Sequence, residues 1–219
     1  MKLNNIILIF IIIFLTNCNN QNNLNGGVSS TSSIASQVGI DILQKGGNAF
    51  DAIVATGFTL AVTSPSNGNL GGGGFLVAHI KDKGAISLDF REKAPEASYE
   101  TMFLDENQQY SRELALNSHK SSGVPGTVNG LIKIFNDYGS GNFTLEEIMA
   151  PAIYYAENGH EINSNAASGF DYYKSLFFRD TGSTKIFIKN VTDEMLNAKE
   201  NYISGQISTE EYSVTLANM

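Results

Sequence analysis

The fold is decided by residues 46–95, which read GGNAFDAIVATGFTLAVTSPSNGNLGGGGFLVAHIKDKGAISLDFREKAP. The glycines at 46 and 47 end one helix, because glycine adopts the left-handed C-cap conformation at little cost. Asn48 is then a favourable N-cap, and Asp51 falls at the third helical position, where its charge suits the helix dipole. Residues 49–62 are almost all apolar or small, and such a helix lies in a core or in lipid. Because a bilayer needs roughly 20 residues, we expect a core helix.

Four successive glycines at residues 71–74 follow this helix. Glycine permits unusual backbone dihedrals and the close approach of another chain segment or a ligand. A phosphate-binding loop is disfavoured, since no Lys-Ser/Thr pair follows the glycines and they precede a strand. Two interpretations stay open, a tight helix-to-strand connection and direct contact with a ligand, and the sequence favours the connection.

Residues 75–91 predict a β-hairpin, with a strand at 75–80, a turn at 81–84 and a return strand that ends in Arg91. Side chains alternate along a strand, so Asp89 and Arg91 share one face and the apolar residues 86, 88 and 90 share the other. We expect this hairpin to pack on the helix at 49–62. A guanidinium at a strand end can bind a carboxylate through two parallel hydrogen bonds. The alternative is a plain ion pair with Asp89 or Glu92, and chemistry alone favours that alternative.

A second glycine-containing stretch lies at residues 117–130, which read NSHKSSGVPGTVNG. Its glycines and its proline predict a sharp bend, followed by an amphipathic helix at 127–138. Thr144 and Glu147 then have the spacing of a capping box at the start of another helix, which Gly159 ends.

The length of 219 residues is compatible with one domain, and the net charge of −8 argues against nucleic-acid binding. The chain also offers no basic patch for anionic lipid. The three histidines, His79, His119 and His160, lack metal-ligand spacing, so we expect no metal site. No Ser-His-Asp arrangement and no pair of carboxylates indicates a catalytic site within the chain.

The first 18 residues predict a signal peptide of the bacterial lipoprotein type. Lys2 supplies the positive charge, residues 6–15 are an apolar run too short for a membrane span, and Leu-Thr-Asn-Cys ends at Cys18. Asn17 departs from the usual Gly, Ala or Ser, and the alternative is an ordinary secretory peptide. We favour lipid attachment at Cys18, with residues 19–27 as a flexible tether. The expected location is the periplasm, or the membrane of a bacterium through a lipid anchor.

Four motifs together resemble the γ-glutamyltransferase family, also called γ-glutamyltranspeptidase or glutathione hydrolase. They are GGNAFDA from residue 46, NLGGGGF from residue 69, DFREKAP from residue 89 and SGVPGTV from residue 122. The resemblance covers residues 28–189, the N-terminal part of the family's large subunit, and leaves 190–219 as a divergent tail. It implies an α+β fold, a partial αββα sandwich of the N-terminal-nucleophile (Ntn) hydrolase type. It also implies that Arg91 holds the α-carboxylate of the γ-glutamyl substrate.

The resemblance further implies transfer of a γ-glutamyl group from a small molecule such as glutathione to water or an amino acid, without a metal or organic cofactor. The family's nucleophile is the N-terminal threonine of its small subunit, with its own α-amine as base. No threonine of this chain lies in the family's cleavage motif, so we assign no catalytic residue here.

Three explanations account for the lack of the family's nucleophile in this sequence, and they differ in whether the chain takes part in an enzyme. It is a truncated or split product of a γ-glutamyltransferase gene, or a separately encoded small subunit or remaining half completes it. In the third explanation it is a non-catalytic periplasmic lipoprotein that keeps the fold as a binding module. We rank the explanations in that order.

Overall fold

The computed structural model describes residues 26–67, 69–162, 164–178 and 180–188, together with residues 201, 204 and 206. The predicted signal peptide with Cys18, most of the tether and most of the tail therefore lie outside the described residues. The chain divides into two compact units, residues 1–159 and residues 160–219, and each is described by itself. No helix of the described part is both long and apolar enough to cross a membrane.

Helix α3 (Ala49–Thr63) forms at the predicted place, and a capping box fixes its start. The Asn48 side chain accepts hydrogen bonds from two backbone nitrogens of the first turn, and the Asp51 carboxylate accepts one from the Asn48 nitrogen (2.9 Å). Gly46 has φ 93°, the left-handed conformation predicted for the end of the preceding helix, α2 (Ser33–Gln44). The predicted start of α3 is therefore confirmed.

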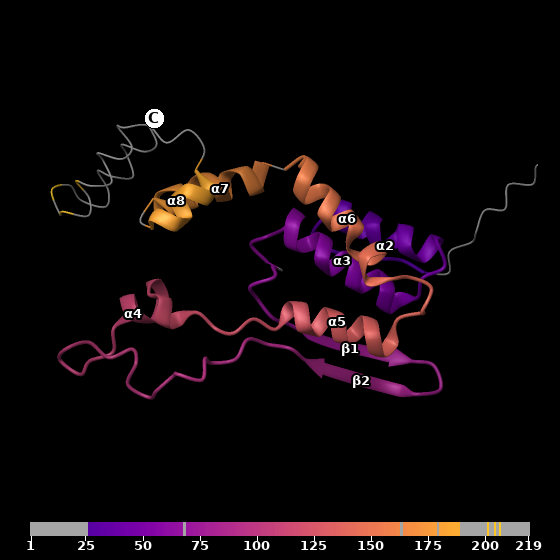
Figure 1. Cartoon of the computed structure of the whole chain (residues 1–219), viewed down its shortest axis with the longest axis horizontal. Coiled ribbons are helices and arrows are strands. Elements are labelled where there is room, and N and C mark those ends of the chain that lie inside the picture. Colours follow the sequence, from indigo (N-terminus) through magenta and orange to yellow (C-terminus); the bar gives the residue numbers. More distant parts are fainter. Residues whose placement is uncertain are drawn as a thin grey trace, which may run out of the picture. The chain divides into compact units, whose positions relative to one another are not determined.

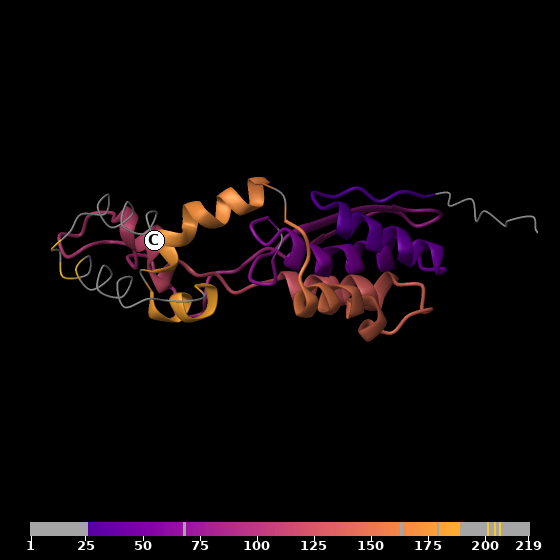
Figure 2. The ribbon, with the colours of Figure 1, turned by 90° about the horizontal axis from the view of Figure 1, so that it is seen from above.

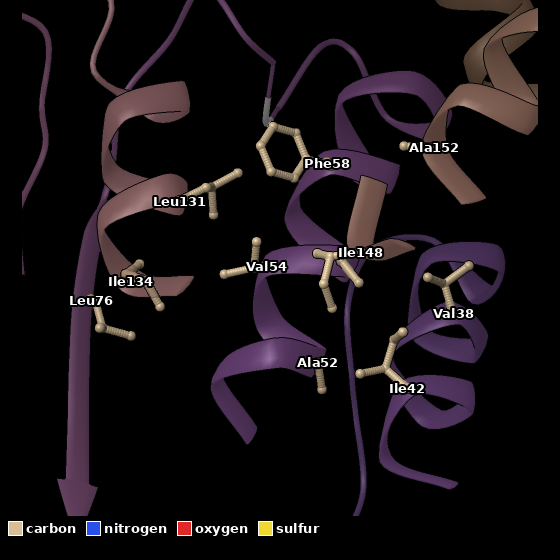
Figure 3. Close-up of a cluster of buried hydrophobic side chains, with 11 residues drawn as sticks. Val38, Ile42, Ala52, Val54, Phe58, Leu76, Leu131, Ile134, Ile148 and Ala152 are labelled. Atoms are coloured by element: carbon tan, nitrogen blue, oxygen red, sulfur yellow. The ribbon is translucent and has the colours of Figure 1, made fainter. Parts of the chain in front are cut away.

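The core of the first unit surrounds α3, which packs against α2, α5 (Thr127–Tyr138) and α6 (Leu145–Asn158). All four helices lie on the same side of the two strands (Figures 1 and 2). The described residues do not cover α3 on every side as predicted, since Ile53 is 44 % exposed. Figure 3 shows the apolar side chains that converge in this core. They are Val38, Ile42, Ala52, Val54, Ala55, Phe58, Leu76, Leu131, Ile134, Ile148 and Ala152.

Strands β1 (Phe75–Ile80) and β2 (Gly84–Asp89) form the predicted antiparallel hairpin. Strand β2 ends at Asp89 rather than at Arg91, which corrects the predicted strand end. The Asp89 carboxylate accepts a hydrogen bond from the Arg91 backbone nitrogen (2.9 Å), and that N–H lies on the side of the strand away from β1, because Phe90 is the residue that bonds Gly74. Only one further pair prolongs the ladder, in which Phe90 exchanges two backbone hydrogen bonds with the glycine loop.

The two faces of the hairpin differ strongly in burial. The inner face joins the core through Leu76 and the partly buried apolar side chains of β2, and Phe90 packs against Gly130 of α5. On the outer face, Phe75 is 64 % exposed and Val77 is 80 % exposed. Within the described residues the sheet consists of these two strands, and the side chains of its outer face are exposed.

A buried carboxylate ties the start of α3 to the loop between α5 and α6. Asp51 is fully buried, and its oxygens accept hydrogen bonds from the Ser140 backbone nitrogen (3.2 and 3.1 Å) as well as from Asn48. The Asn48 amide donates to the Tyr138 carbonyl (2.8 Å), and the Tyr138 ring stacks on Phe50 with 5.0 Å between centroids. The GGNAFDA motif therefore holds two loops together.

Replacing Asp51 with alanine is expected to lower the free energy of unfolding by about 2–4 kcal/mol. The change leaves two backbone N–H groups without their acceptor, and each such loss costs roughly 1–3 kcal/mol when the group is buried. Urea denaturation of the purified chain measures the effect. Asp41→Ala is the matched control, because among the described residues the Asp41 carboxylate accepts a hydrogen bond from the exposed Gln37 side chain alone, and a surface change costs within about 0.5 kcal/mol. An equal loss of unfolding free energy in the two variants would show that the hydrogen bonds of Asp51 do not stabilise the fold.

The predicted capping box at the start of α6 is also confirmed. The Thr144 hydroxyl accepts a hydrogen bond from the Glu147 backbone nitrogen (3.2 Å), and the Glu147 carboxylate accepts one from the Thr144 backbone nitrogen (2.7 Å). Hydrogen bonds from the backbone and the hydroxyl of Thr144 hold the pKa of Glu147 below its ordinary value. The helix ends before Gly159, as predicted, and it continues through Pro151 as one helix rather than restarting there.

Residues 94–123 form a long connecting segment within the first unit. Backbone pairing of Lys93 with Val124 holds the two ends of this segment together. The segment carries the short helix α4 (Arg112–Asn117) and the 3-10 helix η1 (His119–Ser121).

The second unit contains helices α7 (Ser164–Phe177) and α8 (Thr181–Phe187), which contact each other. The Thr184 hydroxyl lies within hydrogen-bond distance of the Phe177 carbonyl (2.9 Å), and the rings of Phe177 and Phe187 stack with 4.8 Å between centroids. These contacts hold α7 and α8 against each other.

Candidate functional site

Three segments that are far apart in the sequence meet around Arg91, and we call this meeting point the glycine junction: residues 71–74, 90–93 and 123–127. The Gly72 carbonyl accepts hydrogen bonds from the Gly126 nitrogen (2.9 Å) and the Thr127 nitrogen (3.0 Å). Residues 74 and 90 exchange two backbone hydrogen bonds, and residues 93 and 124 exchange two more. Backbone bonds therefore fix the Arg91 segment from both sides.

The glycines of the junction serve close backbone contact. A Cβ atom on Gly73 would lie 2.7 Å from the Phe90 carbonyl oxygen and 2.8 Å from the Arg91 Cα. A Cβ atom on Gly126 would overlap the same Phe90 carbonyl. Only glycine lets the three segments approach this closely. Gly73 therefore serves the close approach of another chain segment, and both sequence interpretations, a tight helix-to-strand connection and direct contact with a ligand, stay predictions.

The guanidinium of Arg91 is held loosely. Its side chain is 64 % exposed, and its Nε lies 3.8 Å from the Glu92 Oε2, which is beyond hydrogen-bond distance. Asp89 bonds the Arg91 backbone nitrogen. Of the two ion pairs that the sequence left open, only the one with Glu92 forms, and exposed pairs of this kind contribute about 0–1 kcal/mol. The Arg91 guanidinium carbon also lies 5.8 Å from the centroid of the Phe75 ring.

This arrangement presents a cation that can take a ligand. Among the described residues, no hydrogen bond occupies the guanidinium of Arg91. A planar guanidinium on a fixed backbone can bind a carboxylate bidentately, with charge-assisted hydrogen bonds that are about twice as strong as neutral ones. The chemistry that the junction supports is therefore recognition of a small anionic group.

The three histidines do not come together in the structure. His79 lies on the exposed outer face of β1, His119 lies in η1, and the His160 ring contacts the neighbouring Glu161 carbonyl (3.0 Å). In the part of the chain that the structure describes, no three His, Cys, Asp or Glu side chains form a group that could hold a metal ion.

Three of the four family-like motifs meet at the glycine junction, whereas GGNAFDA lies at the start of α3, the end of that helix away from the junction. Sequence reasoning missed two residues of the site, Phe75 and Gly126. Alternation alone could not have found Phe75, because its place on the face of Arg91 follows from the strand register, in which it pairs with Asp89. Gly126 carried no local signal beyond its place in a bend.

Comparison with known proteins places this chain in a known class. The Gamma-glutamyltranspeptidase family model matches residues 35–210. The "Glutathione hydrolase proenzyme" of Escherichia coli (strain K12) is 43 % identical over 150 residues, 68 % of this chain and 26 % of that protein. The protein of the same name from Pseudomonas aeruginosa is 43 % identical over 159 residues, 73 % of this chain and 28 % of that protein. The crystal structure of Helicobacter pylori gamma-glutamyltranspeptidase matches with a TM-score of 0.72 and 40 % identity, over 75 % of this chain and 47 % of that chain.

These matches show a chain of mixed helix and strand that shares its fold with gamma-glutamyltranspeptidase structures. The chain belongs to the γ-glutamyltranspeptidase family. It spans about a quarter of the length of the curated relatives named above. The family match also runs past residue 189 into the segment that the sequence interpretation treats as a divergent tail.

Proposed function

We propose that this chain supplies the N-terminal part of the large subunit of a γ-glutamyltransferase, which transfers the γ-glutamyl group of glutathione to water or an amino acid. Within it, residues 28–189 form the family segment, and Arg91 binds the α-carboxylate of the γ-glutamyl group. The observation that carries the proposal is the exposed Arg91 guanidinium, which the glycine junction holds on a fixed backbone. The family match and the relatives named glutathione hydrolase support the reaction.

We infer that the described hairpin is part of an αββα sandwich of the Ntn-hydrolase type. Helices lie on its inner face, and its outer face exposes Phe75 and Val77. Two strands alone are marginally stable in water, and an exposed apolar face beside open strand edges favours pairing with more protein. The remaining length of the relatives, about three quarters, is enough to supply that second layer. This second layer belongs either to a longer form of this chain or to a separately encoded remaining half.

The nucleophile of this enzyme lies in that remaining part, as the N-terminal threonine of a small subunit. The acyl transfer needs no metal and no organic cofactor, because the threonine hydroxyl attacks and its own α-amine takes the proton. This chain contributes the carboxylate-binding cation and no catalytic residue.

The 219-residue chain alone is therefore expected to release no p-nitroaniline from γ-glutamyl-p-nitroanilide above the uncatalysed background. Purified chain at micromolar concentration, followed by absorbance over hours, tests this expectation. Added glutathione with detection of free glutamate is the parallel assay. Turnover at rates typical of enzymes, roughly 1–1,000 per second, would place the nucleophile inside the chain and overturn the assignment.

We also propose export of the chain and lipid attachment at Cys18, followed by a tether at residues 19–27. The support is sequence alone: Lys2, the apolar run at 6–15 and Cys18, the only cysteine of the chain. Globomycin should cause accumulation of the uncleaved precursor, and mass analysis should find an acylated mature N-terminus at Cys18. A mature protein that begins elsewhere and carries no acyl chain would rule out the lipoprotein assignment.

A further inference from the structure

Phe75 is an exposed aromatic residue that lies beside the Arg91 guanidinium. It begins β1 directly after the four glycines, and its ring stays 64 % exposed on the outer face of the hairpin. The Arg91 guanidinium carbon lies 5.8 Å from the centroid of this ring. That distance lies within the range in which an aromatic face attracts a cation.

The strand register brings these two residues together. Phe75 pairs with Asp89, so Arg91, two residues further along, is its diagonal neighbour on the same face. The Asp89 carboxylate fixes the Arg91 backbone nitrogen (2.9 Å). Gly73 lies against the Arg91 Cα and brings no side chain that competes for the space. The Arg91 backbone is therefore fixed. Among the described residues, its guanidinium contacts the Phe75 ring and the Glu92 carboxylate.

We propose that Phe75 is a positioning residue for Arg91, which holds the guanidinium over the outer face while its N–H groups stay available for a carboxylate ligand. A ring attracts the cation without accepting a conventional hydrogen bond, whereas a carboxylate such as that of Glu92 occupies N–H donors. The inference deepens the proposed function, because it rests on Arg91 as the carboxylate site. The ligand class is a small molecule with a free α-carboxylate.

The test follows the Arg91 Nε–Hε resonance by NMR in the full chain. The chain has three arginines, so Arg112 and Arg179 serve as internal references and Arg91→Lys assigns the signal. Phe75→Leu is expected to shift the Arg91 resonance and to increase its fast motion, since the ring current and the contact are both lost. Phe75→Tyr keeps the ring and should restore the wild-type signal. The melting temperature should change little, because the ring is largely exposed.

Val77→Ala is the matched control, because Val77 lies on the same outer face, two residues along the strand, and is even more exposed. It should leave the Arg91 resonance unchanged. An unchanged Arg91 signal in Phe75→Leu, or an equal shift in Val77→Ala, overturns the positioning role.

Titration with L-glutamate separates this inference from the proposed function. The wild-type Arg91 resonance should move with L-glutamate, and Phe75→Leu should weaken the apparent affinity by about twofold to fivefold, the range for an exposed cation–π contact. Suppose that Phe75→Leu shifts the Arg91 resonance but L-glutamate does not shift the wild-type resonance. The contact of Phe75 with Arg91 is then supported, and the assignment of Arg91 as the carboxylate site is wrong. If L-glutamate binds equally well to wild type and Phe75→Leu, the positioning role is overturned and the site assignment stands.

Discussion

Replacing Arg91 with lysine in an assembled γ-glutamyltransferase that contains this segment is expected to raise KM by roughly 10-fold to 150-fold. Lysine keeps the charge but loses the planar fork that meets a carboxylate with two hydrogen bonds. Lysine still pairs with the carboxylate, so the cost is that of a lost hydrogen bond to a charged group, about 1.5–3 kcal/mol, and 1.4 kcal/mol corresponds to a factor of ten. The loss should fall on KM rather than kcat, because the contact holds ground state and transition state alike.

The assembly for this measurement is a hybrid enzyme: the Escherichia coli glutathione hydrolase proenzyme with its matching 150-residue segment replaced by that of this chain. Arg112→Lys is the matched control, since Arg112 is an exposed arginine in helix α4 of the same unit. It should leave KM unchanged. If KM of the Arg91→Lys hybrid stays within about twofold while its melting temperature falls sharply, Arg91 is a structural ion-pair residue and the site assignment is wrong.

The second large effect is expected for Gly126→Ala, which should lower the free energy of unfolding by roughly 3–5 kcal/mol. The new Cβ atom would overlap the Phe90 carbonyl, a backbone group that cannot turn aside as a flexible side chain can. Relief requires movement of the bend, which breaks the hydrogen bonds that the Gly72 carbonyl accepts from Gly126 and Thr127. Overpacking of this kind costs about 1–3 kcal/mol, and the lost hydrogen bonds add to it.

Gly27→Ala is the control for this stability measurement. A Cβ atom on Gly27 would meet no heavy atom within 4 Å. Its free energy of unfolding should therefore stay within about 0.5 kcal/mol of wild type, as for other surface changes. Urea denaturation of both variants decides the matter. If the Gly126→Ala chain is as stable as the Gly27→Ala chain, the close approach of the three segments of the glycine junction does not contribute to stability.

Helices α2, α3, α5 and α6 and the hairpin were predictable from the sequence because their signals are local, whereas α4, α7 and α8 were not predicted. Asn48 and Asp51 stand three residues apart and form the capping box that their spacing predicts. Alternation along residues 84–89 likewise gave the inner and outer faces of β2. The end of β2 was missed by only two residues, and the ladder with β1 closes at the hydrogen-bonded pair of Phe90 and Gly74.

The glycine junction was not predictable from such signals, because it joins segments that are about 20 to 50 residues apart in the chain. The sequence indicated a bend around Gly126 but not that the bend meets the Phe90 carbonyl. The cation–π contact of Phe75 with Arg91 depends on the register of two strands, which alternation alone does not fix. The exposure of Ile53 likewise depends on which other parts of the protein cover α3.

The measurement that tests the central claim most directly is the activity of the hybrid enzyme itself with γ-glutamyl-p-nitroanilide. If residues of this chain form the carboxylate-binding part of a γ-glutamyltransferase, the hybrid should mature into two subunits. It should then release p-nitroaniline with a kcat/KM within about tenfold of the parent proenzyme. The isolated chain should stay inactive in the same assay. A hybrid that matures, melts as one cooperative unit and yet shows no turnover would contradict the claim that this segment carries the substrate site of the family.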